Sequence, residues 1–153
     1  MDKENTLYID LKDGRVTIEM RPDLAPKHVA QIKKLARDGK YDGIVFHRVI
    51  EGFMAQTGDP QGTGMGGMGA MLPAEFSKEP HVRGTVSMAR TNDVNGADSQ
   101  WFICFQPSNF LDGKYTVWGK VVSGMEFVDK IKRGEPVRNP DKIVSIRVAA
   151  DVK

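Results

Sequence analysis

The sequence of 153 residues predicts a mainly β domain, either a sandwich or a closed barrel, with two helices. Three observations lead to this class. About eight short segments have strand character, helical periodicity occurs only twice, and strands do not alternate regularly with helices. The last observation argues against a doubly wound parallel sheet. One helix falls early in the chain and one late, so each could cover an open end of a barrel.

The first two strands form the clearest hairpin. Residues 8–11 and 15–20 alternate apolar and polar side chains with a period of two. Asp13 and Gly14 lie between them, and this pair is typical of a two-residue type I′ turn because that turn needs positive φ angles. We therefore predict an antiparallel hairpin at the start of the chain.

Two segments have helical periodicity. Pro26 opens the first, since its missing N–H is harmless in the first turn, and Gly39 ends it. The second helix is expected over about 124–133, where Ser123 and Glu126 fit a capping box. The apolar stripes are Val29, Ile32, Leu35 and Ala36 in the first helix and Met125, Val128 and Ile131 in the second.

Six further strands and one irregular stretch complete the chain. The strands are expected at 44–50, 53–58, 83–89, 101–105, 115–122 and 142–149. The irregular stretch, 59–82, contains glycine-rich residues 62–69, which match G-x-G-x-x-G twice in overlapping register. A dinucleotide site needs a helix directly after this motif, but Ala70 to Pro73 is a poor helix start. No Gly-Lys-Ser/Thr follows either, so we interpret residues 62–69 as a flexible surface loop.

Composition narrows the possible partners and the compartment. The net charge of +2 is small and evenly spread, which argues against nucleic acid and anionic membranes as ligands. The first five residues do not form a signal peptide, and no apolar run has transmembrane length. The single Cys104 excludes an intramolecular disulfide and suits a reducing compartment. We expect one domain over 1–153, cytoplasmic and monomeric.

Metal and nucleophile chemistry receive little support. His28 is expected to be solvated on the first helix, His81 lies in a loop, and His47 should face the opposite side of its strand from Arg48. No pair of histidines has metal-ligand spacing, and Cys104 has no cysteine partner, so no metal site is expected. Two serines in strand-like surroundings lack an elbow motif, and Cys104 is interpreted as an inert packing residue. The serines are Ser87 and Ser99.

Arg48 is the most informative residue. It is a permanent cation within the apolar run 45–50, and an unpaired guanidinium is costly to bury. Its position makes sense if it points into a pocket and serves a ligand. Strand periodicity places it on one face with Phe46 and Ile50. A plain exterior arginine, paired with an acid such as Glu51, explains the local sequence equally well.

Four longer segments decide between these interpretations. They are FHRVIEGFMAQTGD (46–59), GTVSMA (84–89), NGADSQWFI (95–103) and LDGKYTVWGKV (111–121). Together they resemble the signature of cyclophilin-type peptidyl-prolyl isomerases, in order and at family spacing. The resemblance extends from about residue 7 to 133 and is weakest at 60–82. Several separate motifs agree, so the combined signal is far more specific than any one of them.

The resemblance implies a fold, an activity and a site. The fold is a closed eight-stranded antiparallel β-barrel capped by two α-helices, with the site on the outside of the barrel. The activity is rotation about X–Pro bonds in peptides and folding proteins, with no cofactor or metal. Arg48 is the implied catalytic residue, and it stabilises the twisted amide. The implied substrate-binding residues are Phe53, Met54, Phe102 and Leu111 in a proline pocket, Gln56 and Gln100 for the substrate backbone, and Ala89 and Arg90 along the adjacent strand edge.

Two positions depart from many well-known members of that family. Phe110 stands where they carry tryptophan at the rim of the cleft, and Tyr115 where they often carry histidine. The first change removes an indole N–H that such members use to bind the macrocycle cyclosporin, so we expect weak cyclosporin binding with isomerase activity kept. The combination resembles bacterial members. Two rival functions remain: a proline-peptide-binding module on the same fold, and a nucleotide-binding protein that uses the glycine-rich loop.

Overall fold

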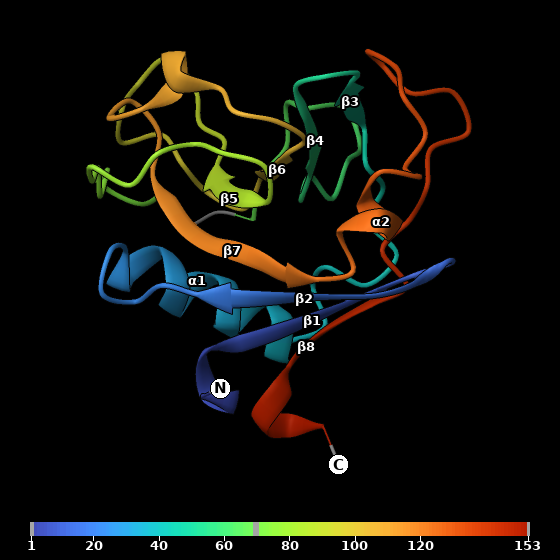
Figure 1. The fold of residues 1–153 in the computed structure, drawn as a ribbon, viewed down its shortest axis with the longest axis horizontal. Coiled ribbons are helices and arrows are strands. Elements are labelled where there is room, and N and C mark those ends of the chain that lie inside the picture. Colours follow the sequence, from blue (N-terminus) through green and yellow to red (C-terminus); the bar gives the residue numbers. More distant parts are fainter. Residues whose placement is uncertain (1, 69–70, 153) are drawn as a thin grey trace.

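Eight antiparallel strands form one strongly curled sheet (Figure 1). In the computed structural model, residues 2–68 and 71–152 are described. The strands are β1 (Thr6–Leu11), β2 (Gly14–Met20), β3 (Arg48–Ile50), β4 (Met54–Thr57), β5 (Thr85–Met88), β6 (Trp101–Cys104), β7 (Val117–Ser123) and β8 (Ser145–Val148). Their order in the sheet is β3-β4-β6-β5-β7-β2-β1-β8, and every pair of neighbours is antiparallel. The mainly β class with eight antiparallel strands is confirmed.

The sheet closes through irregular backbone bonds rather than through an eighth strand pairing. Its end strands are β3 and β8, and the segments that precede them run side by side. Val45 and Lys142 form an antiparallel bridge, and the N–H of Ile143 donates to the carbonyl of Ile44 at 2.8 Å. These bonds satisfy backbone groups that an open sheet edge would leave unpaired. A further bridge, between Val49 and Gly134, brings the chain around residue 135 close to β3.

The β1–β2 hairpin is present, but its turn is not type I′. Leu11 pairs with Gly14, so Lys12 and Asp13 are the central residues. Neither has a positive φ, since Asn139 is the one non-glycine residue with positive φ among those described. Gly14 instead follows the two turn residues and has a φ of 157°. A Cβ at this position would lie 2.5 Å from the Phe127 ring. The type I′ prediction was therefore wrong, because the glycine makes room for a packed ring.

Helix α1 (Pro26–Arg37) covers part of the sheet and buries its predicted apolar stripe. Ala25 at its N-cap makes no side-chain hydrogen bond. The carboxylate of Glu75 instead accepts the backbone N–H groups of Lys27 and His28 at 3.2 and 2.9 Å. The His28 ring is fully buried, with Nδ1 2.6 Å from Glu75 Oε1. The expectation that His28 is solvated was wrong, because the residue lies one turn before Ile32 on the buried face.

Helix α2 is shorter than predicted. It spans Met125–Val128, and Gly124 occupies its N-cap with a φ of 86°. The capping box is absent, since Gly124 makes no side-chain cap bond and Ser123 is the last residue of β7. Three short 3-10 helices complete the chain: η1 (Lys3–Asn5), η2 (Asn109–Leu111) and η3 (Ala149–Asp151). Among the described residues, no helix has both the length and the apolar composition of a membrane span.

Strand alternation separates two apolar clusters. Along β6, Trp101 and Ile103 belong to the main core, and Phe102 and Cys104 belong to a second, smaller cluster. Trp101 packs edge-on against Trp118 inside the barrel, at 5.7 Å between ring centroids. The barrel interior is therefore filled with side chains. The smaller cluster lies on the opposite face of the sheet, so a site on this face lies outside the barrel.

Candidate active site

A small cavity of about 140 Å³ opens on the face of the smaller cluster. It takes residues from β3, β4, β6 and η2 and from the segments after β3, β5 and η2. The lining residues are Arg48, Phe53, Met54, Gln56, Ala89, Arg90, Phe102, Leu111 and Tyr115. All of them are residues that the sequence resemblance implied. The structure therefore brings together side chains that lie up to 67 positions apart, from Arg48 to Tyr115.

The floor of the cavity is apolar. Met54, Phe102 and Leu111 are each at most 6% exposed and pack together in the smaller cluster. Tyr115 meets the Phe102 ring edge-on, with 6.0 Å between centroids. Phe53 packs on Phe110 at 5.5 Å. Such a floor suits a small aliphatic ring rather than a charged ligand.

Phe110 and Gln100 lie at the margin of this cavity rather than in its lining. Phe110 is 65% exposed, in keeping with the predicted place at the rim. Gln100 lines a neighbouring cavity of about 510 Å³, which shares Gln56, Ala89 and Arg90 with the first. The two cavities therefore form one continuous surface, on which an extended peptide could occupy both.

Arg48 is held by hydrogen bonds at one edge of the apolar floor. It faces Gln56 across the β3–β4 pair, and its Nη1 donates to Gln56 Oε1 at 3.2 Å. Gln56 Nε2 in turn donates to Gln100 Oε1 at 2.9 Å. Gln100 Nε2 donates to the carbonyls of Gly64 and Gly66. This chain of hydrogen bonds fixes the guanidinium and both glutamines relative to one another.

Two expectations about the surroundings of Arg48 were wrong. Phe46 does not share its face, because β3 begins only at Arg48 and Phe46 is buried in the main core. Glu51 is not its partner, since that carboxylate lies 2.6 Å from Arg133. The acid near Arg48 is Glu135, with Oε1 3.5 Å from the arginine Nε. No pattern in the sequence indicated Glu135, which lies near Arg48 because Val49 and Gly134 form a backbone bridge.

The glycine-rich loop is anchored by one buried carboxylate. Asp59 accepts the backbone N–H groups of Gln61, Thr63, Gly64 and Gly66. Burial raises the pKa of Asp59, but these four donors outweigh that effect and the pKa lies below its usual value. The described part of the loop is therefore hydrogen-bonded rather than merely flexible, and residues 69–70 lie outside the described residues. Because these four N–H groups bind Asp59, they are not available to a phosphate. This argues against the hypothesis that the loop binds a nucleotide.

A buried polar array supports the cavity from behind. The His81 ring stacks on Phe102, and its Nδ1 and Nε2 lie 3.0 Å from Asp112 Oδ1 and 2.9 Å from Ser87 Oγ. The array has the composition of a catalytic triad, but Ser87 is fully buried and donates to the carbonyl of Thr116. Because no substrate can reach Ser87, the array positions the floor of the cavity instead.

Two further features of the described residues bear on the requirements of a reactive thiol and of a metal-ligand cluster. Cys104 is free and buried, and burial raises the pKa of its thiol to about 12, so it stays protonated. The interpretation of Cys104 as an inert packing residue agrees with this. The described part of the chain contains no group of three or more His, Cys, Asp or Glu side chains that could hold a metal ion.

Comparisons with known proteins agree with this geometry. Residues 6–149 match the family model described as cyclophilin type peptidyl-prolyl cis-trans isomerase/CLD. A probable peptidyl-prolyl cis-trans isomerase of Brucella suis is 58% identical, over 99% of this chain and 86% of the relative. Peptidyl-prolyl cis-trans isomerase B of Bacillus subtilis is 43% identical, over 87% of this chain and 94% of its own.

The chain also resembles solved structures of cyclophilins. The chain resembles a cyclophilin from Hirschia baltica with a TM-score of 0.92 and 32% identity, over 100% of this chain and 77% of that one. It resembles a cyclophilin-type isomerase from Cryptosporidium parvum, crystallised in the presence of the dipeptide Ala-Pro, with a TM-score of 0.87 and 28% identity. That match covers 94% of this chain and 98% of the other.

Proposed function

The chain belongs to the cyclophilin-type peptidyl-prolyl cis-trans isomerases, and from that premise we propose how its residues perform the reaction. The substrate class is X–Pro bonds in peptides and in folding proteins. Arg48 is the catalytic residue, and the apolar cavity holds the proline ring. The observation that carries the proposal is the position of this fixed cation at the edge of a cavity with an apolar floor.

The barrier to be lowered is the loss of amide resonance. Rotation about a peptide bond crosses about 18–20 kcal/mol, because the C–N bond has partial double-bond character. In the twisted state the proline nitrogen becomes pyramidal and carries a free lone pair. A hydrogen-bond donor placed there stabilises the transition state but not the planar ground state, and only such differential stabilisation accelerates a reaction.

Arg48 has a donor suited to this task. Gln56 occupies its Nη1, and Glu135 lies near its Nε. Among the described residues no hydrogen-bond partner is present at its Nη2, so this N–H group is available to a substrate. A guanidinium stays protonated at any working pH, and its donors strengthen when the substrate excludes water. Arg48 therefore acts as an electrostatic stabiliser rather than as an acid or base.

The other residues of the site hold the proline ring and orient the substrate backbone. An apolar floor of Met54, Phe102 and Leu111 fits the pyrrolidine ring, so the ring is held while the carbonyl side of the bond rotates. Gln56 and Gln100 lie where they can hydrogen-bond the substrate backbone. Ala89 and Arg90 follow β5 and line both cavities, and Tyr115 lines the first cavity beside Phe102.

No single contact accounts for the whole acceleration. A million-fold rate increase needs about 8 kcal/mol of transition-state stabilisation. One charged hydrogen bond contributes about 1.5–3 kcal/mol. Positioning of the ring and exclusion of water from the guanidinium must contribute the rest. These terms need no covalent intermediate.

Exchange NMR on a short Ala-X-Pro peptide tests the proposal. We expect the wild-type chain to accelerate cis–trans exchange strongly at substoichiometric concentration. Phe102→Leu should lower kcat/KM by about tenfold or more, because a changed pocket shape costs 1–3 kcal/mol in fit. Phe76→Leu is the matched control, since Phe76 is 42% exposed and lies outside the cavity lining.

The same experiment distinguishes the proposed isomerase from a module that only binds proline peptides. If the wild-type chain bound the peptide without accelerating exchange, the site would be a proline-recognition module and the catalytic proposal would be wrong. If Phe102→Leu and Phe76→Leu behaved alike, the cavity described above would not be the proline pocket.

A further inference from the structure

One carboxylate outside the lining of the proline cavity, that of Glu135, lies beside Arg48. The charged residues among the nine that line the cavity are both arginines, Arg48 and Arg90. Two guanidinium groups alone would attract acidic substrates. Glu135 alters this balance, because its Oε1 lies 3.5 Å from Arg48 Nε. Its side chain is 58% exposed, so its charge acts on whatever approaches Arg48 from solvent.

The backbone holds Glu135 in this place. Val49, the residue after Arg48, exchanges two hydrogen bonds with Gly134, the residue before Glu135, at 2.9 and 2.8 Å. Gly134 has a φ of 154°, and a Cβ there would lie 2.8 Å from the carbonyl oxygen of Pro136. Only glycine fits these constraints without a shift of the chain. Glu135 is thus placed beside β3 by this pair of backbone bonds.

Two other carboxylates lie closer to a basic partner than Glu135 lies to Arg48. Glu51 lies 2.6 Å from Arg133, and Asp129 lies 2.6 Å from Arg83. Among the described residues, the 3.5 Å contact with Arg48 is the one ion pair of Glu135. Glu135 is therefore the carboxylate on this side whose charge acts directly on a residue of the cavity.

We propose that Glu135 is a specificity-determining residue that disfavours substrates with an acidic side chain next to the proline. The inference rests on the proposed isomerase function. With the proline ring in the cavity, the adjacent residues of the peptide lie within about 10 Å of Arg48, since consecutive Cα atoms are about 3.8 Å apart. At that range an exposed carboxylate repels a second carboxylate and attracts an ammonium group.

Matched peptides and matched variants test this selectivity. The peptides have blocked termini and differ only in a Glu, Gln or Lys placed directly before or directly after the proline. The proteins are wild type, Glu135→Gln and the control Glu51→Gln, which removes the same charge from a residue that Arg133 holds. The readout is kcat/KM from exchange NMR, at low salt and in 1 M NaCl.

The expected result is a change in preference rather than in basal activity. Glu135→Gln should raise the ratio of kcat/KM for the Glu peptide to that for the Lys peptide by about three- to tenfold at low salt, on at least one side of the proline. The change should shrink in 1 M NaCl, because salt screens exposed charges. With the Gln peptide, Glu135→Gln should stay within about twofold of wild type, and this also shows that the variant is folded. Glu51→Gln should keep the wild-type ratio.

Two results would overturn the inference while leaving the isomerase intact. One is an unchanged Glu-to-Lys ratio in Glu135→Gln, with normal exchange of the Gln peptide. The other is an equal change in Glu51→Gln, which would mean that net charge alone sets the preference. Failure of the wild-type chain to accelerate exchange of any peptide is a third, distinct result. It would overturn the proposed function, and this inference with it.

Discussion

Phe110 lies at the rim of the cavity, outside its lining. It is 65% exposed and contacts Phe53, so it contributes an aromatic face at the rim without a polar group. The residues that form the apolar floor do not depend on it. Replacement of Phe110 by tryptophan adds an indole N–H donor at the same place.

We therefore predict that Phe110→Trp tightens cyclosporin binding and leaves isomerase activity within about twofold. One new neutral hydrogen bond contributes about 0.5–1.5 kcal/mol, so the dissociation constant should fall by about three- to tenfold. Calorimetric titration measures it directly. Val144→Trp places the same indole at another exposed position, outside the cavity lining, and should leave binding unchanged. An equal affinity for wild type and Phe110→Trp would show that the rim donor does not matter.

The sequence predicted that the cavity-lining residues come together, because the family resemblance implies it. Arg48, Gln56 and Phe102 belong to strands whose order and register the family pattern implies, so their convergence could be expected. Glu135 could not be predicted, because it reaches Arg48 only through the irregular bonds between Val49 and Gly134. No periodicity encodes a contact of that kind.

At the scale of the element, helix α1 depends on a residue far away in the chain. Its first N–H groups have no partner within the helix, and its N-cap residue Ala25 offers no side-chain acceptor. Glu75 supplies a carboxylate at this positive end of the helix dipole. Burial raises the pKa of Glu75, but the donors from His28 and Lys27 prevail and the pKa lies below its usual value. The carboxylate therefore stays ionised in neutral solution.

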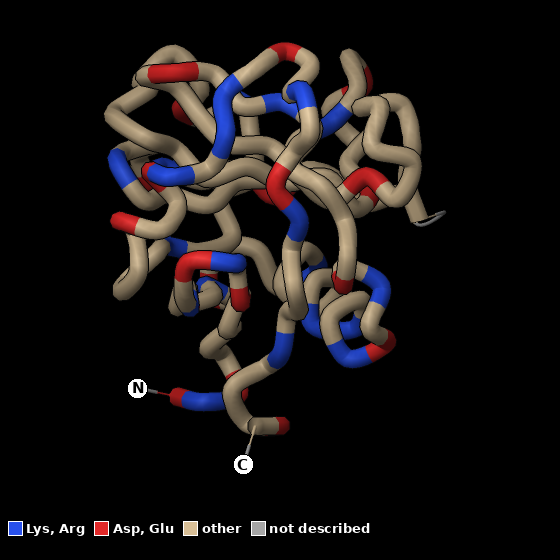
Figure 2. The backbone as a smooth tube through the Cα atoms, turned by 90° about the vertical axis from the view of Figure 1, so that its right-hand side faces the viewer, with Lys and Arg blue, Asp and Glu red and all other residues tan. Residues whose placement is uncertain are grey.

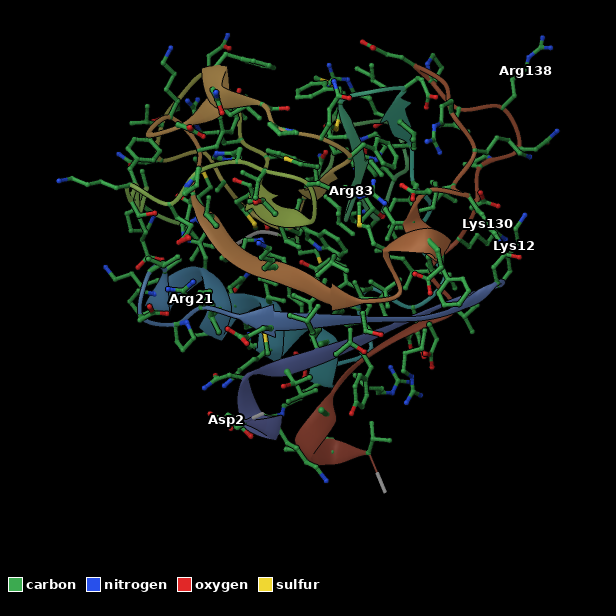
Figure 3. The ribbon with its side chains drawn as sticks, in the orientation of Figure 1. Asp2, Lys12, Arg21, Arg83, Lys130 and Arg138 are labelled. Carbon is green, nitrogen blue, oxygen red and sulfur yellow. The ribbon has the colours of Figure 1, made fainter. Side chains whose placement is uncertain are left out.

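We predict that Glu75→Gln lowers the free energy of unfolding by about 1–2 kcal/mol, because the charge at the helix N-terminus is lost. Urea denaturation measures this as a lower midpoint with an unchanged slope. Glu79→Gln is the control, since Glu79 lies in an exposed contact 3.6 Å from Arg21 (labelled in Figure 3). If the two variants lost equal stability, Glu75 would not act as the cap of α1.

The sequence predicted helices and strands where hydrophobic periodicity determines them. It missed the end of a helix where a side chain hydrogen-bonds the backbone carbonyls. The β1–β2 hairpin and the stripe of α1 follow from alternation and a 3.6-residue period. Helix α2 stops at Val128, although Ile131 is buried as the stripe predicted. Beyond Val128, the Arg133 guanidinium donates hydrogen bonds to the carbonyls of Asp129 and Ile131, each at 2.6 Å. A helical pattern cannot indicate such a competitor for backbone groups.

At the scale of the whole molecule, charges are mixed along the chain rather than gathered into blocks of one sign (Figure 2). Arg138, labelled in Figure 3, projects away from the ribbon on the loop before β8. The charged groups that matter for the site are instead Arg48, Arg90 and Glu135.

Three buried histidines make the stability of the molecule depend on pH. Burial lowers the pKa of His28, His47 and His81 below the usual value of 6.5, although nearby carboxylates partly oppose this. Each histidine is therefore neutral in the folded chain over a range where the unfolded chain already binds a proton. The folded state loses stability as the pH falls below about 6.5, by at most about 1.36 kcal/mol per pH unit for each histidine. Above that pH the histidines contribute no slope.

We predict that His47→Phe reduces this acid sensitivity. Within the described part of the chain neither ring nitrogen of His47 has a hydrogen-bond partner, so the variant removes a titrating group without breaking a hydrogen bond seen there. Urea denaturation at several pH values between 5 and 8 should give a slope smaller by up to one proton below pH 6.5. The same slope in wild type and His47→Phe would show that His47 does not titrate on unfolding.

The fold as a whole was predictable because eight short alternating segments leave few architectures. Closure of the sheet was implied by the family resemblance rather than by the residues that perform it. Val45, Ile44 and Ile143 lie outside the named strands or at their margins, and nothing in their pattern specifies a partner. Long-range backbone bonds of this kind become visible only in three dimensions.

The measurement that tests the account most directly separates binding from rotation in Arg48 variants. NMR line shapes of a short X–Pro peptide give its dissociation constant and its exchange rate at saturation, for wild type, Arg48→Lys and Arg48→Ala. We predict that Arg48→Ala lowers the saturated exchange rate by about 10²–10³-fold, as loss of one transition-state donor does elsewhere, with the dissociation constant changed only a few-fold. Arg48→Lys should recover part of the rate, because an ammonium group keeps the charge but not the fork of donors. A weaker dissociation constant with an unchanged saturated rate would contradict the account, since Arg48 would then serve binding alone.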